Sequence, residues 1–119
     1  MNIKEVAFVA IAVSDKDRAK EFYQGILGLK PGMTAMEGAW VEYEIGATTI
    51  GVGCHQAWQP SRDGTTVAFE VEDFDAAHDE LSGKGIEWDI PKTETPVCWM
   101  AQFRDPDGNK LVVHKRKAK

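Results

Sequence analysis

Apolar residues follow two different periods along this chain. Val6 to Val13 and Thr66 to Val71 are rich in Val, Phe and Ile with few polar positions, which predicts strands. After the first run, apolar residues recur at i, i+3, i+4, i+7 and i+8, the period of one helix face. These residues are Ala19, Phe22, Tyr23, Ile26 and Leu27. Gly28 is expected to end this helix as a left-handed cap.

The second half repeats this order. A helix is expected from about Asp73 to Ser82, with Phe74, Ala77 and Leu81 on one face. Both predicted helices begin at polar residues that can cap the free backbone N–H groups, with acidic residues in the first turn. The cap of the first helix is Ser14 or Asp15.

Paired strands are predicted after each helix. Trp40 to Ile45 and Thr48 to Gly53 form one expected hairpin across Gly46-Ala47. Trp99 to Phe103 and Leu111 to Lys115 form the other.

The turn of the second hairpin has a clear signature. It is Asp105-Pro106-Asp107-Gly108, in which Pro fixes φ and Gly supplies the positive φ. A third strand is expected near Lys30 to Thr34 in the first half and near Ile86 to Asp89 in the second.

A weak internal repeat supports two modules. At an offset of 58 residues, Ala10-x-x-Val13-x-Asp15 becomes Ala68-x-x-Val71-x-Asp73. We therefore expect residues 1–119 to form a single domain with one module in 1–59 and another in 60–119. The polar segment from Gln59 to Gly64 is the expected joint.

Composition limits the function classes. A net charge of −5 without a basic patch disfavours nucleic-acid binding. No segment approaches the roughly 20 apolar residues of a membrane span, and the start of the chain does not resemble a signal peptide. Cys54 and Cys98 are expected to be free thiols in a reducing cytoplasm.

Several motifs in order resemble one superfamily. Val9-Ala10-Ile11-Ala12-Val13 followed by Phe22-Tyr23 and Leu27-Gly28-Leu29 resembles the opening of the vicinal oxygen chelate superfamily, which includes glyoxalases, bleomycin-resistance proteins and extradiol dioxygenases. Val67-Ala68-Phe69 and Asp105-Pro106-Asp107-Gly108-Asn109 resemble its closing half. The resemblance implies an α+β fold of two tandem βαβββ modules, curled around a cleft that in the enzymes holds a divalent metal. It also implies a homodimer.

The positions that correspond to the family's metal ligands do not carry metal-binding side chains. They are Phe8, Gly51, Thr66 and Val112. Apolar side chains and glycine offer no ligand, and Thr is a poor one for Zn or Fe. We therefore expect neither a metal nor another cofactor.

Aromatic residues suggest a different use of the cleft. Trp40 and Trp99 occupy roughly matching strands, and with Phe8 and Tyr43 they could line a pocket for a small organic molecule. The alternative is plain core packing. The expected ligand-binding residues are Phe8, Trp40, Tyr43, Thr66, Trp99 and Val112.

Titratable residues offer two catalytic candidates. Glu70 and His114 share strand parity with the expected cleft and could act as acid or base. The alternative is a solvated surface position for both. The adjacent Cys54 and His55 should point to opposite faces of a strand, which disfavours a nucleophile pair, and His78 is expected to be structural.

Three functional hypotheses remain open. The favoured one is a metal-independent protein that binds a small organic molecule, one that could be cationic given Glu42 and Glu70. The second is a glyoxalase-like lyase, isomerase or dioxygenase with a displaced metal site (His55, His114 and Glu70) or metal-free acid/base chemistry. The third is a regulatory module whose cleft is filled by side chains.

Overall fold

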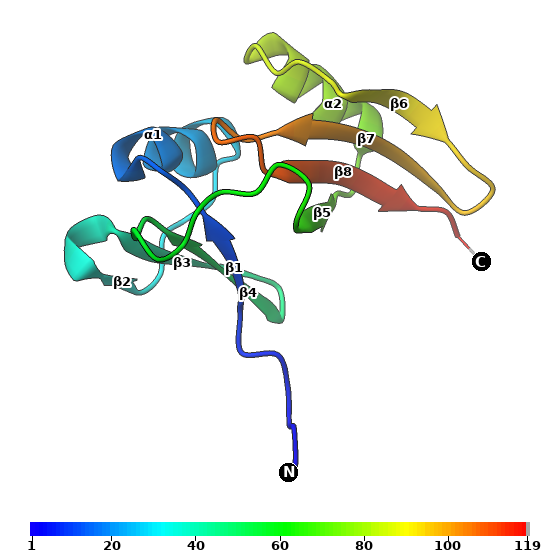
Figure 1. Cartoon of the computed structure of the whole chain (residues 1–119). Helices are drawn as coiled ribbons and strands as arrows, with labels where there is room; N and C mark the ends of the chain where they lie inside the picture. The colour runs from blue at the N-terminus through cyan, green and yellow to red at the C-terminus, as the bar shows by residue number, and fades with distance from the viewer. Residues whose placement is uncertain (119) are drawn as a thin grey trace. The chain divides into compact units, whose positions relative to one another are not determined.

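The chain folds into two compact units, Met1–Pro60 and Ser61–Lys119. The structure is a computed structural model that describes residues 1–118. Each unit contains one four-stranded sheet and a helix that follows its first strand, as the ribbon shows (Figure 1). The two units are described separately below.

The first unit follows a βαβββ order. Its strand order is β1-β4-β3-β2, with β1 parallel to β4 and the other neighbours antiparallel. Its elements are β1 (Val9–Ala12), α1 (Lys16–Lys20), η1 (Glu21–Ile26), β2 (Thr34–Ala35), η2 (Met36–Gly38), β3 (Trp40–Ile45) and β4 (Thr48–Gly53).

The second unit has the same topology. Its strand order is β5-β8-β7-β6, with β5 parallel to β8. Its elements are β5 (Thr66–Glu70), α2 (Phe74–Gly83), β6 (Ile90–Glu94), β7 (Cys98–Arg104) and β8 (Lys110–Arg116). The predicted α+β fold of two tandem βαβββ modules is therefore confirmed, as two open mixed sheets.

The first helical region is capped as the sequence predicts. The Asp15 carboxylate accepts from the backbone N–H groups of Asp17 and Arg18 at 3.0 Å, which satisfies two donors of the first turn. Lys16–Lys20 is α-helical, and the chain continues directly into a π-helical segment, η1. Gly28, at φ 71°, follows the end of this segment in the left-handed region.

Side chains of the first sheet alternate between a helix-facing side and an opposite side. Tyr43 faces the helical region, because its ring stacks on Tyr23 at 6.1 Å and its hydroxyl accepts from Gln24 at 3.1 Å. Ile50 is the register partner of Tyr43 and is buried on the same side. Trp40 is three positions from Tyr43 in β3, so it lies on the opposite side.

The second sheet has its core on the side that faces α2. Ala101, Phe103 and Leu111 are fully buried there. Trp88, which follows α2, meets the Phe103 ring edge-on and thereby links the helix to this side of the sheet. Val112 and its register partner Gln102 point to the other side.

Both third strands differ from their predicted positions. The predicted strand at Ile86 to Asp89 is wrong, because Trp88 stacks on His78 at 4.5 Å and donates to Ser82, which ties this segment to α2. Strand pairing begins only at Ile90. In the first unit, β2 is limited to Thr34–Ala35, although Gly32 and Met33 already exchange backbone hydrogen bonds with Glu42.

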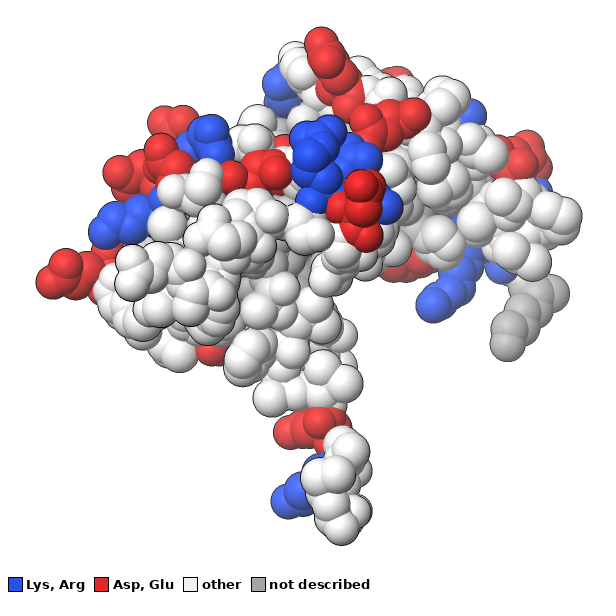
Figure 2. Space-filling view, in the orientation of Figure 1, with Lys and Arg blue, Asp and Glu red and all other residues white. Residues whose placement is uncertain are grey.

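The surface agrees with the charge pattern of the sequence. On the face shown in Figure 2, acidic and basic side chains are interspersed and do not form one basic area. Among the described residues, no helix has the length and apolar character needed to cross a membrane.

The turn between β7 and β8 is held by a dense set of hydrogen bonds. The Asp105 carboxylate accepts from the backbone N–H groups of Asp107 and Asn109, and the Gly108 N–H donates to the Asp105 carbonyl at 2.9 Å. Gly108 adopts φ 87°, the left-handed conformation predicted for it. Arg104 donates to the carbonyls of both Gly108 and Arg62, which brings the segment before β5 onto this turn.

We predict that Gly108→Ala destabilises the protein by about 1–2 kcal/mol. The positive φ is unfavourable for alanine, and a Cβ at this position would lie 2.5 Å from Nη1 of Arg62. Urea unfolding measures the effect. Gly83→Ala is the matched control, because its Cβ would meet nothing within 4 Å and its backbone is helical. Equal stability of the two variants would contradict this account of the turn.

Candidate functional site

The indole of Trp40 lies against two glycines of β4. A Cβ at Gly51 would come within 2.1 Å of the Trp40 ring, and one at Gly53 within 2.9 Å of it. Register pairs Trp40 with Gly53 and Glu42 with Gly51, so all four residues share the side of the sheet away from α1. The glycines are therefore required at these positions, because a side chain at Gly51 would displace the Trp40 indole and one at Gly53 would meet the rings of both Trp58 and Trp40.

Three aromatic rings meet on this side of the first unit. Phe8 contacts Trp40 edge-on at a ring separation of 5.2 Å, and Trp58 contacts Trp40 at 5.5 Å. Phe8 is 46% exposed and Trp58 43%, whereas Trp40 between them is only 7% exposed. We call these three residues the aromatic surface.

Two polar residues border the aromatic surface. The Trp40 indole N–H donates to a carboxylate oxygen of Glu42 at 3.0 Å, which fixes the ring across the glycines. His55 lies on the far side, with its ring 5.6 Å from that of Trp58 and its Nδ1 accepting from the Ala57 N–H. A ligand on this surface would thus meet apolar rings first and polar groups at the border.

The predicted ligand-binding residues are only partly brought together. Phe8 and Trp40 are in contact, as the hypothesis requires. Tyr43 lies on the opposite side of the same sheet, 1% exposed, so it packs under the helical region and does not share the aromatic surface. Trp99 lies in the second unit on the α2-facing side, where it lines a pocket with Phe74.

Thr66 and Val112 lie in the second unit on the side of the sheet away from α2. Val112 pairs in register with Ala68, and Thr66 stands two residues earlier in β5 with the same parity. Thr66 is exposed and Val112 is 6% exposed.

The positions that would hold the family's metal do not fit one. Gly51 has no side chain, and the Trp40 ring fills the space that a carboxylate there would need. Phe8 offers only an aromatic ring, and Val112 only an isopropyl group. Across residues 1–118, no group of three or more His, Cys, Asp or Glu side chains is arranged to hold a metal ion.

The two catalytic candidates, Glu70 and His114, form a pair. Nδ1 of His114 lies 2.6 Å from a carboxylate oxygen of Glu70, and the other oxygen accepts from the backbone N–H of Arg116 at 2.8 Å. The Arg116 N–H, and after it His114, holds the pKa of Glu70 below its ordinary value. A lowered pKa makes a carboxylate a weaker base, so Glu70 lacks the raised pKa on which its predicted role as a base depended. It orients His114 instead.

Trp58 contributes to the aromatic surface but is absent from the ligand-binding residues predicted from the sequence. It lies outside the regular strands, where the period of apolar residues does not indicate a side, and an isolated bridge to His55 and the contact with the Trp40 ring hold it in place. One signal was present: glycines at 51 and 53 alternate on one side of a strand that neighbours a tryptophan-containing strand. Such a pattern indicates that a large side chain crosses the strand.

Comparison with known proteins establishes the family. The model of the Glyoxalase/Bleomycin resistance protein/Dioxygenase superfamily matches residues 5–113, and the chain belongs to this superfamily. Two uncharacterized proteins of Bacillus subtilis (strain 168), YraH and YetH, are 27% and 26% identical to it, over 90% of this chain and 94% of each relative.

Solved structures show the same fold. TnmS3, an antibiotic binding protein from Streptomyces sp. CB03234, aligns with a TM-score of 0.81 at 24% identity, over 98% of this chain and 99% of TnmS3. A glyoxalase/dioxygenase from Nostoc punctiforme also aligns with a TM-score of 0.81, at 19% identity, over 98% and 94%. At these identities the likeness establishes the fold alone.

We predict that Gly51→Ala destabilises the protein by about 1–3 kcal/mol, because the new methyl group forces the Trp40 ring off the strand. Denaturant unfolding followed by tryptophan fluorescence measures the loss. Gly25→Ala is the control, since a Cβ there would meet nothing within 4 Å. The packing is refuted if Gly51→Ala is as stable as Gly25→Ala.

We predict that Glu70→Gln lowers stability at neutral pH by less than about 1 kcal/mol, because Glu70 is half exposed. Its folded pKa lies below the unfolded one, so its stabilisation is present above the unfolded glutamate value of about 4.3 and is lost as pH falls through the folded pKa.

The measurement is the difference in free energy of unfolding between wild type and variant from pH 7 to pH 3. The difference should shrink toward zero at the acid end. Glu5→Gln removes the same charge from the exposed segment before β1 and should show no such trend. A difference that stays constant with pH would contradict the paired state of Glu70.

Proposed function

We propose that this protein binds a small organic molecule with an aromatic or otherwise apolar body, and that it does so on the aromatic surface without a metal. One observation carries the proposal: two half-exposed rings, Phe8 and Trp58, flank a third ring held in place from below. Aromatic side chains that lack cover are typical of ligand-binding surfaces.

The rigidity of Trp40 supports a binding role. Its ring rests on the glycine backbone of β4, and its N–H is held by Glu42. A preformed ring loses little conformational entropy when a ligand packs on it, which favours affinity. Phe8 and Trp58 offer faces and edges on which a planar molecule can stack.

The family relation supports binding without metal chemistry. Phe8, Gly51 and Val112 offer no ligand for the metal that the superfamily's enzymes use, so the proposed binding does not involve a metal. TnmS3 shares the fold and is an antibiotic binding protein, so this fold can carry a small-molecule site.

Other features of the hypothesis follow from the resemblance. We infer a cytoplasmic location, in keeping with the free thiols of Cys54 and Cys98, and a homodimer, which rests on the family resemblance alone. Thr66 and Val112 remain predicted ligand contacts of the second unit. Sedimentation equilibrium tests the dimer.

A second candidate function rests on the Glu70–His114 pair. A carboxylate 2.6 Å from Nδ1 fixes the imidazole orientation and leaves Nε2 able to take up or release a proton. Such a pair could serve a metal-free lyase or isomerase. Binding on the aromatic surface remains the first proposal. The Glu70–His114 pair is exposed to solvent, and a catalytic pair usually lies in a site that excludes water.

We predict that Trp58→Ala and Phe8→Ala each weaken binding of N-phenyl-1-naphthylamine by about threefold to tenfold, the loss of one aromatic contact. This neutral aromatic probe becomes fluorescent in apolar surroundings, and its titration gives the affinity directly. Addition of a chelator should leave the affinity unchanged.

Ile3→Ala is the matched control, because Ile3 is an exposed apolar residue of the same N-terminal segment. Equal affinities of wild type, Phe8→Ala and Trp58→Ala would overturn the binding surface, provided that urea unfolding shows each variant to be folded. For a physiological ligand, mass spectrometry after incubation separates the two functions. Recovery of the ligand unchanged supports binding, and conversion that His114→Gln abolishes supports acid/base catalysis.

A further inference from the structure

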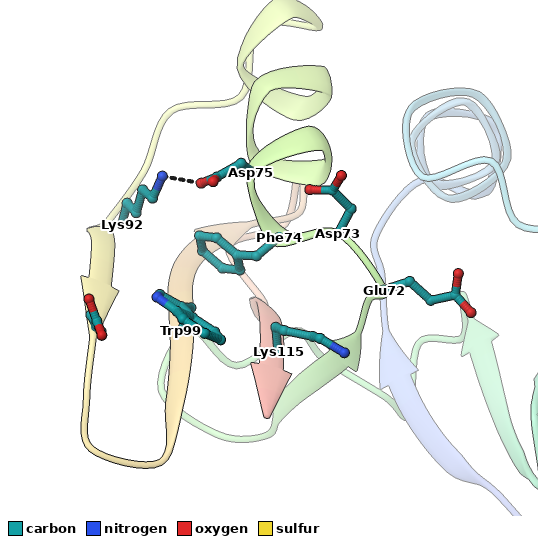
Figure 3. Close-up of a pocket in the computed structure, with 8 residues that line it drawn as sticks. Glu72, Asp73, Phe74, Asp75, Lys92, Trp99 and Lys115 are labelled. Atoms are coloured by element: carbon teal, nitrogen blue, oxygen red, sulfur yellow. Dashed lines mark hydrogen bonds and ion pairs between the residues drawn. The ribbon is translucent and has the colours of Figure 1, made fainter. Parts of the chain in front are cut away.

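The second unit contains a pocket of about 500 Å³ that the proposed function does not use. It lies between the start of α2 and strands β6, β7 and β8 (Figure 3). Its lining residues are Glu72, Asp73, Phe74, Asp75, Lys92, Glu94, Trp99 and Lys115.

Two aromatic rings form the apolar part of this pocket. Phe74 is buried in the first turn of α2, and its ring points toward Trp99 of β7 (Figure 3). Lysines of the same unit already lie near both rings: Nζ of Lys92 is 5.9 Å from the centre of Phe74, and Nζ of Lys117 is 4.9 Å from the centre of Trp99. The two rings form an apolar wall of the pocket, and each has a lysine nearby.

Most charges around the pocket are already paired. Lys92 pairs with Asp75, and Lys117 pairs with Glu94. Asp73 accepts from the Ala76 N–H at 3.0 Å as the cap of α2.

Two charged residues of the lining are unpaired. Within residues 1–118, the structure shows no ion pair or hydrogen bond of the Lys115 side chain or of the Glu72 side chain, although the Lys115 backbone pairs with Trp99 in the sheet. In Figure 3, Asp73, Lys115 and Glu72 lie on the side of Phe74 away from the Lys92–Asp75 pair, and the Glu72 carboxylate is directed away from the two rings.

We propose that this pocket binds a small zwitterion with an apolar side group, of the class of aromatic α-amino acids. The ligand carboxylate pairs with Lys115, its ammonium group with Glu72 and Asp73, and its side group packs on Phe74 and Trp99. The two opposite charges of such a ligand lie close together, and they match a pocket lining that carries charges of both signs.

Singly charged ligands fit this lining less well. An organic anion would be repelled by the carboxylates of Glu72 and Asp73, and an organic cation would be repelled by the ammonium group of Lys115. A zwitterion can pair with Lys115 and with the carboxylates at the same time. The proposal concerns residues of the second unit only, so it is independent of the aromatic surface.

The test uses L-phenylalanine as the probe and the indole N–H of Trp99 as the reporter. Two-dimensional ¹H–¹⁵N spectra resolve the four tryptophans, and Trp99→Phe identifies the signal. We expect a saturable shift of the Trp99 signal. Phenethylamine, which lacks the carboxylate, and 3-phenylpropionate, which lacks the amine, should each bind about threefold to fivefold more weakly.

Matched variants connect the effect to the pocket. Lys115→Gln should weaken L-phenylalanine by about threefold to fivefold and leave phenethylamine no weaker than before. Lys4→Gln removes the same charge from the exposed N-terminal segment and should change neither affinity. Phe8→Ala should also leave L-phenylalanine binding unchanged, which separates this test from that of the proposed function.

Two results would overturn the proposal. One is a Trp99 signal that does not saturate with L-phenylalanine. The other is equal affinity for L-phenylalanine, phenethylamine and 3-phenylpropionate, since that would mean that the rings bind without any role for the charged residues.

Discussion

The contact between the Trp40 indole and the glycines at 51 and 53 determines what one side of the first sheet can be used for. A ring that lies across a strand requires that the strand carry no side chains beneath it. The same requirement removes the position from which a family enzyme would supply a metal ligand. The exposed rings of Phe8 and Trp58 then extend this apolar area outward. Packing and the loss of metal chemistry are therefore two consequences of one arrangement.

The two units share a topology but use it differently. Ala10 pairs with Gly51 in the first unit, and its repeat counterpart Ala68 pairs with Val112 in the second. On the next strand, Glu42 pairs with Gly51 and Gln102 pairs with Val112, so Glu42 and Gln102 are equivalent positions. Two residues earlier, Trp40 is therefore equivalent to Met100. Trp99 is one residue away from this match, and it consequently points to the α2 side. The two tryptophans that look equivalent along the sequence thus belong to different surfaces.

Polar groups outside the aromatic surface show how context changes the meaning of a residue. Glu70 and His114, on neighbouring parallel strands, come together as a hydrogen-bonded pair, and the backbone of Arg116 adds a second bond to the carboxylate. The Arg116 N–H, and after it His114, lowers the pKa of Glu70, which becomes a partner that orients a histidine. Around Phe74 and Trp99, by contrast, the side chains of Glu72 and Lys115 have no partner within residues 1–118, and the pocket therefore presents charges of both signs.

The sequence by itself determined the order of elements, the helix caps and the hairpin turn, because these depend on local signals: Asp15 at a helix start, Gly28 after its end, and Gly108 at positive φ. It also determined the family, through several short motifs in order. Only the tertiary structure decided which side of its sheet each aromatic residue occupies, since a shift of one residue in strand register reverses that side. Tyr43 is the example: residue type suggested a ligand contact, while register and the stacking on Tyr23 place it in the core. Trp58 is the converse, because a loop residue joins the aromatic surface only through the path of the folded chain.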